Sequence, residues 1–152
     1  MTPLRATRTY PHWDLVSELI HDAFAYMEPL LGHPARAASV TPEHLADASE
    51  LGAAFIIEDA GRPVACLFTR PSRDIPDALY LGWLAVEAKQ RGKGLAAILI
   101  RQAETEARNL GNPLMTLDTG HVLTDLHRLF ERLGFQALPG DAAIITFTKP
   151  VD

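Results

Sequence analysis

The sequence has little cysteine, no long apolar run and no excess of basic residues, and each shortage excludes a class of protein. Cys66 is the only cysteine, so an intramolecular disulfide and a cysteine-based metal cluster are both excluded. No stretch approaches the roughly 20 consecutive apolar residues of a membrane-spanning helix, and the N-terminus lacks the apolar core of a secretory signal. A soluble cytoplasmic protein with no membrane partner is therefore expected.

The charge and the length narrow the remaining classes. A formal net charge of −5 argues against nucleic acid as a partner, because binding to phosphates needs a basic surface. The chain has 152 residues, of which 47% are apolar and 22% are charged, as is typical of one globular domain. We see no repeat and no linker in the sequence, so residues 1–152 are expected to form a single domain.

Apolar periodicity and turn residues predict a mixed series of helices and strands. The first helix is expected at residues 14–29, and Thr41 with Pro42 is a typical start for a second helix that ends near residue 50. A strand–helix–strand unit within a mostly antiparallel series implies an α/β fold, with a mixed, mostly antiparallel central sheet flanked by helices. The strands are expected at residues 4–8, 53–58, 63–70, 77–86, 113–119, 135–138 and 143–149, and further helices at 92–110 and after an N-cap at Thr124.

The most informative segment joins a strand to the longest helix and has the sequence LAVEAKQRGKGLA over residues 84–96. The first turn of a helix leaves backbone N–H groups without partners, and the helix dipole favours negative charge there. Glycines allow a phosphate to come close to these groups, and Arg91 and Lys93 add positive charge. The segment therefore predicts an anion site at a helix N-terminus, best suited to a pyrophosphate.

Two nucleotide-binding motifs compete for the same segment. A Walker-type P-loop requires Gly-Lys followed by Ser or Thr, which is absent here. A dinucleotide fingerprint G-x-G-x-x-A fits residues 92–97, with Asp118 at the end of the next strand. However, polar residues separate Gly92 from the preceding strand, and the strands before it are expected to be antiparallel. A dinucleotide-binding domain is therefore a discounted alternative.

The third interpretation is a family resemblance. Residues 91–96, RGKGLA, match the R/Q-x-x-G-x-G/A loop of the GNAT superfamily of acyl-CoA-dependent N-acetyltransferases. The preceding LAV strand, the later RLGF at residues 132–135 and the order of elements also resemble this family over nearly the whole chain. The resemblance implies an N-acetyltransferase with acetyl-CoA as co-substrate, although the acyl group could also be longer than acetyl.

The resemblance also assigns residues to acetyl-CoA. In the family, the strand before the loop separates from its neighbour at a bulge, and its free backbone groups pair with the pantetheine amides. That role would fall to Leu84, Ala85 and Val86. The backbone amides of the loop would hold the pyrophosphate, and an aromatic residue would lie beside the cofactor. The remaining cofactor-binding candidates are therefore Arg91, Gly92, Lys93, Gly94, Leu95, Ala96 and Phe130.

The catalytic residues are less well assigned. Acyl transfer needs a neutral amine and a thiolate leaving group that is stabilised or protonated. Many members of the family protonate the thiolate with a Tyr where this chain has Phe130, so the usual acid is missing. Direct transfer in a ternary complex is expected, because Cys66 is on the wrong strand to act as a nucleophile. The candidate acids are Tyr80, His127 and His121, and the candidate bases are Asp118 and Glu28, although Asp118 equally fits a turn carboxylate.

The first two helices and the loop between them shape the acceptor pocket in this fold. The acceptor remains open between an amino acid, a polyamine, an antibiotic and a protein N-terminus, although the net acidity favours a cation. Tyr80 and Trp83 are three residues apart, so they are expected on opposite faces of their strand. The substrate-binding candidates are Tyr26, Glu28, His33, Trp83 and Thr119.

Three further expectations concern partners and alternatives. The six histidines lack metal-ligand spacing, so no metal is expected. Members of the family often form homodimers through a sheet edge or the C-terminal strands, which leaves a homodimer open for this chain. Phe130 also leaves open a different class of protein, a CoA-binding sensor or interaction partner with weak or no catalysis.

Overall fold

A computed structural model describes residues 1–32, 36–140 and 142–152. The described residues form one sheet in the order β1-β2-β3-β4-β5-β7-β6. Neighbouring strands are antiparallel except for β4 and β5, which are parallel. The expected mixed, mostly antiparallel sheet is confirmed. The strands are β1 (Leu4–Ala6), β2 (Ala53–Asp59), β3 (Arg62–Pro71), β4 (Ala78–Val86), β5 (Leu114–Gly120), β6 (Gln136–Ala137) and β7 (Ile144–Pro150).

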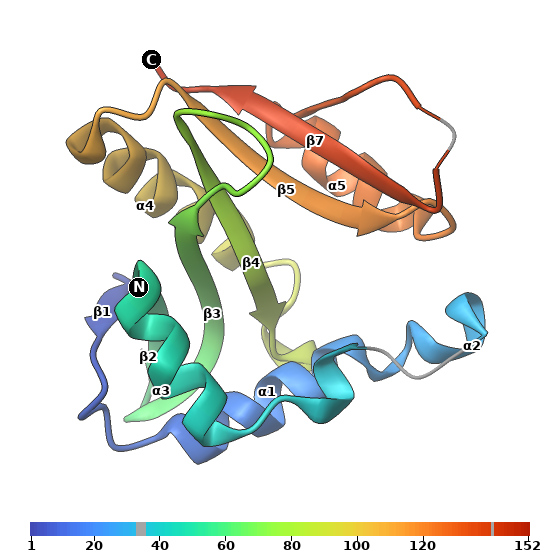
Figure 1. Cartoon of the computed structure of the whole chain (residues 1–152). Helices are drawn as coiled ribbons and strands as arrows, with labels where there is room; N and C mark the ends of the chain where they lie inside the picture. The colour runs from blue at the N-terminus through green and yellow to red at the C-terminus, as the bar shows by residue number, and fades with distance from the viewer. Residues whose placement is uncertain (33–35, 141) are drawn as a thin grey trace.

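Helices cover both faces of the sheet (Figure 1). α1 and α3 pack on one face, over a core that includes Ile20, Leu45 and Phe68. α4 and α5 pack on the other face, over a core that includes Leu99 and Phe130. No helix in the described part of the chain is long and apolar enough to cross a membrane. The helices are α1 (Trp13–Ala25), α2 (Glu28–Leu31), η1 (Arg36–Ser39), α3 (Pro42–Leu51), η2 (Ala88–Gln90), α4 (Leu95–Leu110) and α5 (Thr124–Arg132).

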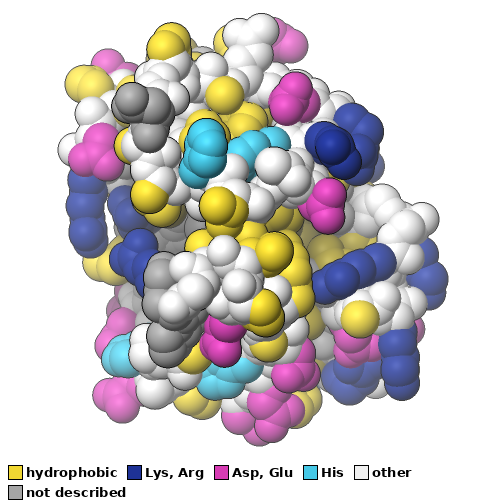
Figure 2. Space-filling model, turned by 90° about the vertical axis from the view of Figure 1, so that its right-hand side faces the viewer, with side chains coloured by type: hydrophobic (Ala, Val, Ile, Leu, Met, Phe, Trp, Pro, Cys, Tyr) yellow, Lys and Arg dark blue, Asp and Glu magenta, His cyan; other side chains and the backbone are white. Residues whose placement is uncertain are grey.

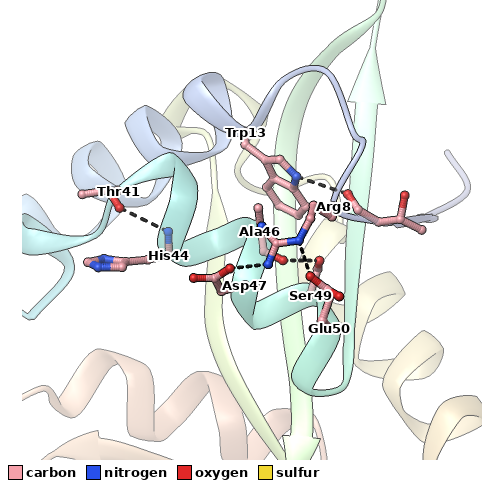
Figure 3. Close-up of polar contacts among 9 residues, drawn as sticks. Arg8, Trp13, Thr41, His44, Ala46, Asp47, Ser49 and Glu50 are labelled. Carbon is pink, nitrogen blue, oxygen red and sulfur yellow. Dashed lines mark hydrogen bonds and ion pairs between the residues drawn. The ribbon is translucent and has the colours of Figure 1, made fainter.

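The start of α3 follows from local sequence, as predicted. The Thr41 side chain accepts a hydrogen bond from the backbone N–H of His44 at 3.2 Å, which satisfies one of the free donors of the first turn. On the outer surface of α3, the carboxylates of Asp47 and Glu50 both pair with the guanidinium of Arg8 (Figure 3). These contacts tie the segment between β1 and α1 to α3.

Three predicted helix boundaries differ from the structure. The first helix ends at Ala25, and Pro29 lies in the first turn of the separate helix α2. α4 begins at Leu95, because Gly92 and Gly94 have φ angles of 81° and 77°, which lie outside the right-handed helical region. Thr124 is the first residue of α5 and its side chain does not cap the helix, whose N-cap residue is Leu123.

Candidate active site

The parallel strands β4 and β5 separate toward their carboxyl ends. Ala78 to Tyr80 pair with Leu114 to Thr116, and beyond this point the two strands diverge (Figure 1). A cleft of about 1410 Å³ occupies the opening, walled by β4, β5, the end of α1, the start of α4 and α5. Seen from the side to which the strands open, hydrophobic side chains gather in the middle of the face, with basic side chains on either side (Figure 2). The separation leaves one edge of β4 without a strand partner in the described chain.

A β-bulge lies in β4 at the wall of this cleft. Cys66 and Phe68 of β3 pair with Ala85 and Gly82 of β4, so β4 contains one extra residue. Trp83 has a φ of 49°, in the left-handed region that non-glycine residues rarely adopt. Its carbonyl oxygen accepts a hydrogen bond from the Cys66 Sγ at 3.2 Å. Burial raises the pKa of the Cys66 thiol to about 12, which keeps the thiol protonated as a donor to the bulge.

The bulge overturns the expectation that Tyr80 and Trp83 point to opposite faces. Leu79 and Leu81 belong to the core under α4, which leaves Tyr80 between them on the α1 side. Trp83 packs against the core under α1, with its ring centroid 6.0 Å from that of Phe24. The extra residue shifts the alternation of side chains by one position, so both aromatic side chains line the same cleft.

The loop after β4 brings its glycines to the cleft. Gly94 is the N-cap residue of α4 and provides no side-chain hydrogen bond to the first turn, so the N–H groups of that turn have no side-chain acceptor. The Lys93 side chain is directed elsewhere, because its Nζ donates to the Gln90 Oε1 at 2.9 Å. The cofactor-binding candidates that line the cleft in the described chain are Leu84, Ala85, Val86, Arg91, Gly92, Gly94, Leu95, Ala96 and Phe130.

Phe130 of α5 forms part of the cleft wall and of the core. Its side chain is 6% exposed. Its ring centroid lies 6.1 Å from that of Phe135 and 5.9 Å from that of Phe147. The ring is therefore fixed by aromatic packing, and this wall offers no hydroxyl at position 130.

Tyr80 and Asp118 lie where the strands part, and both line the cleft. Burial raises the pKa of Tyr80 and the Asp118 carboxylate raises it further, whereas the guanidinium groups of Arg70 and Arg36 oppose this rise. The phenol therefore keeps its proton at neutral pH. Asp118 is exposed and accepts a hydrogen bond from Thr146 Oγ1 at 2.9 Å. The site thus combines a neutral hydroxyl donor with a nearby carboxylate.

Thr119 and Tyr26, two of the predicted substrate-binding residues, line the cleft. Thr119 of β5 is 7% exposed, and its Oγ1 has no hydrogen-bond partner in the described structure. Tyr26 follows the end of α1 and is 45% exposed. Burial raises the pKa of Tyr26, Arg91 lowers it and Asp125 raises it, which places the Tyr26 hydroxyl near the charges of the glycine loop and α5.

The structure does not bring three of the other candidates to the cleft. The Nε2 of His127 lies 2.9 Å from the carbonyl oxygen of Gly120, and its ring packs 5.5 Å from the Phe147 centroid. The described residues that line the cleft do not include His127, His121 or Glu28. Glu28 begins α2, and His33 lies outside the described residues.

Sequence reasoning missed two arginines on the wall of the cleft. Arg70 ends the buried run of β3, and Arg73 follows in the next loop; both line the cleft. The signal was a single charged residue after a long apolar strand, which does not reveal where its side chain points. Within residues 1–32, 36–140 and 142–152, no group of three or more His, Cys, Asp or Glu side chains is arranged to hold a metal ion.

A comparison with models of protein families finds one family. A model of the acetyltransferase (GNAT) family matches residues 13–135. A search of curated protein sequences finds no significant match.

Solved structures with the same fold cover nearly the whole chain. The PaiA N-acetyltransferase from Thermoplasma acidophilum in complex with coenzyme A has a TM-score of 0.79 at 13% identity, covering 99% of each chain. A GNAT-family acetyltransferase from Staphylococcus aureus Mu50 has a TM-score of 0.77 at 10% identity, covering 99% of each chain. An aminoglycoside 6'-N-acetyltransferase complexed with coenzyme A has a TM-score of 0.76 at 17% identity, covering 100% of this chain and 98% of the other.

Proposed function

The chain belongs to the acetyltransferase (GNAT) family, and from this premise we propose that it transfers an acetyl group from acetyl-CoA to a primary amine, by direct attack in a ternary complex. The protein is accordingly an acyltransferase, and the acetyl group, the amine and the ternary complex are the proposal. The observation that carries it is the separation of β4 from β5 beside a glycine loop that opens α4.

The residues of the cleft fit an acyl-CoA. The unpaired edge of β4 offers backbone N–H and C=O groups to the amides of a pantetheine arm, and we assign this role to Leu84, Ala85 and Val86. The first-turn N–H groups of α4 suit a pyrophosphate, with Gly92 and Gly94 allowing close approach. Arg91 adds a positive charge beside them. Two structures of the same fold are described in complex with coenzyme A, which supports this assignment.

The chain's own residues supply the proton transfers. Bound acetyl-CoA brings an activated thioester, and the reaction forms a C–N bond as the C–S bond breaks. We assign to Asp118 the uptake of the proton that the attacking amine loses. We assign to Tyr80 the donation of a proton to the departing sulfur, because this residue lines the cleft and burial raises its pKa. His127 is not assigned this role, because its ring is held against Gly120 outside the cleft.

A second candidate function rests on Phe130. The ring packs into the core and has no hydroxyl to offer, as in a protein that binds CoA without efficient transfer. A CoA-binding sensor would retain the affinity for acetyl-CoA and lack turnover with every amine.

The proposal is tested by titrating acetyl-CoA calorimetrically into the wild type, Gly94→Val and Gly61→Val. Gly94 and Gly61 both have a φ of 77°, and a Cβ at either would meet no atom within 4 Å, so the two substitutions carry a similar backbone strain. Gly61 lies in the β2–β3 turn. Gly94→Val is expected to weaken acetyl-CoA binding by at least about tenfold, and Gly61→Val to leave it unchanged.

Turnover of acetyl-CoA with a panel of primary amines completes the test. Binding with transfer to an amine supports the proposal, whereas binding without transfer to any amine favours the sensor. A wild type that does not bind acetyl-CoA contradicts both.

A further inference from the structure

We propose that the acceptor amine also carries a carboxylate, which Arg36 and Arg70 bind at the acceptor end of the cleft. This inference rests on the proposed function and names the substrate class of the same site. Arg36 comes from η1 and Arg70 from the end of β3, and both line the cleft.

Both arginines line the cleft around Tyr80. The guanidinium carbon of Arg70 lies 4.1 Å from the centroid of the Tyr80 ring, so a cation–π contact holds it over that ring. Arg36 acts on the same phenol, because its charge, like that of Arg70, opposes the rise in the pKa of Tyr80 that burial causes. Two guanidinium groups from elements far apart in the sequence therefore line the same cleft as Tyr80, one of them directly over its ring.

Neither guanidinium has an acidic partner among the described residues. Arg5, Arg8 and Arg62 each form an ion pair with a carboxylate. Arg36 forms no such pair, and the hydrogen bond found for Arg70 runs from its Nη1 to the carbonyl oxygen of Pro71 at 3.2 Å. Two positive groups at the wall of a cleft are thus available to an external anion.

The acidic residues on the same wall do not neutralise the positive charge of the two arginines. Asp74 and Asp118 line this part of the cleft, but neither forms an ion pair with a described arginine. Arg73 also lines the cleft, so three guanidinium groups stand against the two carboxylates. The acceptor end is therefore richer in positive charge than in negative charge, in a chain whose formal net charge is −5.

The chemistry of these groups points to an amino carboxylate. The planar fork of a guanidinium matches the two oxygens of a carboxylate. Asp118, which also acts on the pKa of Tyr80, provides a carboxylate for the amine of the same molecule. A polycation such as an aminoglycoside would place its additional charges against arginines. The acceptor of one structural neighbour is therefore a poor fit for this wall.

A side cavity sets the size of the remainder of the acceptor. It measures about 330 Å³ and adjoins the cleft, because Arg36 and Trp83 line both. Val40 and Leu45 contribute apolar walls, and Ser39 and His44 contribute polar ones. The volume is at the lower end of the range for small-molecule sites, so the cavity suits a small side chain attached to the amino carboxylate.

The test compares each acid with its amide. The probes are L-leucine, L-methionine and L-phenylalanine, the three corresponding amino acid amides, and spermidine and tobramycin as polycations. Steady-state kinetics with acetyl-CoA are measured for the wild type, Arg36→Met, Arg70→Met and the control Arg101→Met. Arg101 is an exposed arginine of α4 that does not line the cleft in the described chain. The basicity of a given amine is the same with every enzyme variant. A change between variants in the ratio of kcat/KM for an acid to kcat/KM for its amide therefore reports on the arginines.

The wild type is expected to prefer the acids. Loss of either guanidinium should raise the KM for the acid by about 10- to 100-fold. The KM for the amide and the affinity for acetyl-CoA should change little. In Arg101→Met, all three quantities should stay close to those of the wild type. A preference for the amides or polycations, or an acid preference that survives in both cleft variants, overturns the inference and leaves N-acetyl transfer standing.

A second readout covers the case in which acetyl-CoA binds but no probe is acetylated. The melting temperature of the CoA-bound protein is then measured with each acid and its N-acetyl derivative. Stabilisation that disappears in Arg36→Met and Arg70→Met supports the carboxylate site, and an absence of stabilisation overturns it. A protein that fails to bind acetyl-CoA contradicts the proposed function and, with it, this inference.

Discussion

At the scale of single residues, Tyr80 has the properties that a proton donor to a leaving thiolate needs. It lines the cleft, and the guanidinium carbon of Arg70 lies 4.1 Å from the centroid of its ring. Burial raises the pKa of the phenol above its ordinary value, so the proton is retained at neutral pH. Sequence spacing proposed Tyr80 only as one of three acids, because it could not show which of them faces the cleft.

The substitution Tyr80→Phe tests this role. It keeps the ring beneath Arg70 and removes the proton, so kcat is expected to fall by about 10- to 100-fold, at the lower end of the effects of general acids. The KM for acetyl-CoA should change little. Because the pKa of Tyr80 is raised, loss of its proton should not lower the wild-type rate until the pH exceeds about 10. Pre-steady-state and steady-state rates between neutral and alkaline pH provide the measurement.

The control is His127→Gln, whose side chain lies outside the cleft and should leave kcat close to that of the wild type. A wild-type kcat in Tyr80→Phe would show that Tyr80 is not the proton donor. A larger loss of kcat in His127→Gln than in Tyr80→Phe would indicate that His127 of α5 is the donor.

At the scale of elements, local signals predicted most helices and strands. Thr41 and Pro42 start α3 because the cap and the fixed proline φ act within one turn. The bulge at Trp83 could not be predicted, since it depends on how β4 pairs with a strand from another part of the chain. The place of Arg70 beside the cleft was missed for the same reason, because it exists only once β3 packs against β4.

The contact between the end of α3 and β3 depends on a residue without a side chain. Gly52 joins α3 to β2, and a Cβ at this position would lie 1.9 Å from the carbonyl oxygen of Thr69 and 2.8 Å from the Cα of Arg70. Both are backbone atoms, which can move only if the strand moves. The same strand carries Arg70 to the cleft, so this close approach also positions the wall of the cleft that contains Arg70.

Gly52→Ala is therefore expected to lower the free energy of unfolding by about 3 kcal/mol, as overpacking of a tightly packed region does. The matched control is Gly61→Ala, where a Cβ meets nothing within 4 Å and the φ is 77°. The control should cost about 1 kcal/mol from the left-handed backbone alone. Urea denaturation followed by circular dichroism measures both. Equal losses in the two variants would show that β3 adjusts to the extra methyl group.

At the scale of the whole molecule, the sheet has two parts joined by a short seam. β1 to β4 form one part and β5 to β7 the other, and the parallel pairing between them covers three residue pairs. The cleft occupies the remainder of this boundary. A ligand bound there contacts both parts, so its binding raises the free energy of unfolding. The overall acidity of the sequence suggested a cationic acceptor, but the net charge of a chain does not show the sign of the local charge at this boundary.

Acetyl-CoA at a concentration of about 100 times its Kd is expected to stabilise the protein by about 2.7 kcal/mol. For a chain of this length, that corresponds to a rise in melting temperature of about 5–10 °C. Differential scanning fluorimetry gives the measurement, with NADH at the same concentration as the control. NADH should produce no comparable rise. A larger rise with NADH than with acetyl-CoA would restore the dinucleotide-binding interpretation of residues 92–97.

The buried thiol beside the bulge makes the chemistry unusually easy to follow. Cys66 is the only cysteine of the chain, it is fully buried, and its pKa is raised to about 12. Disulfide reagents that change colour react with thiolates, so the native protein contributes no background to such an assay. Each coloured equivalent then counts one molecule of coenzyme A released. The progress of the reaction can be recorded continuously in the cuvette, without separating enzyme from product.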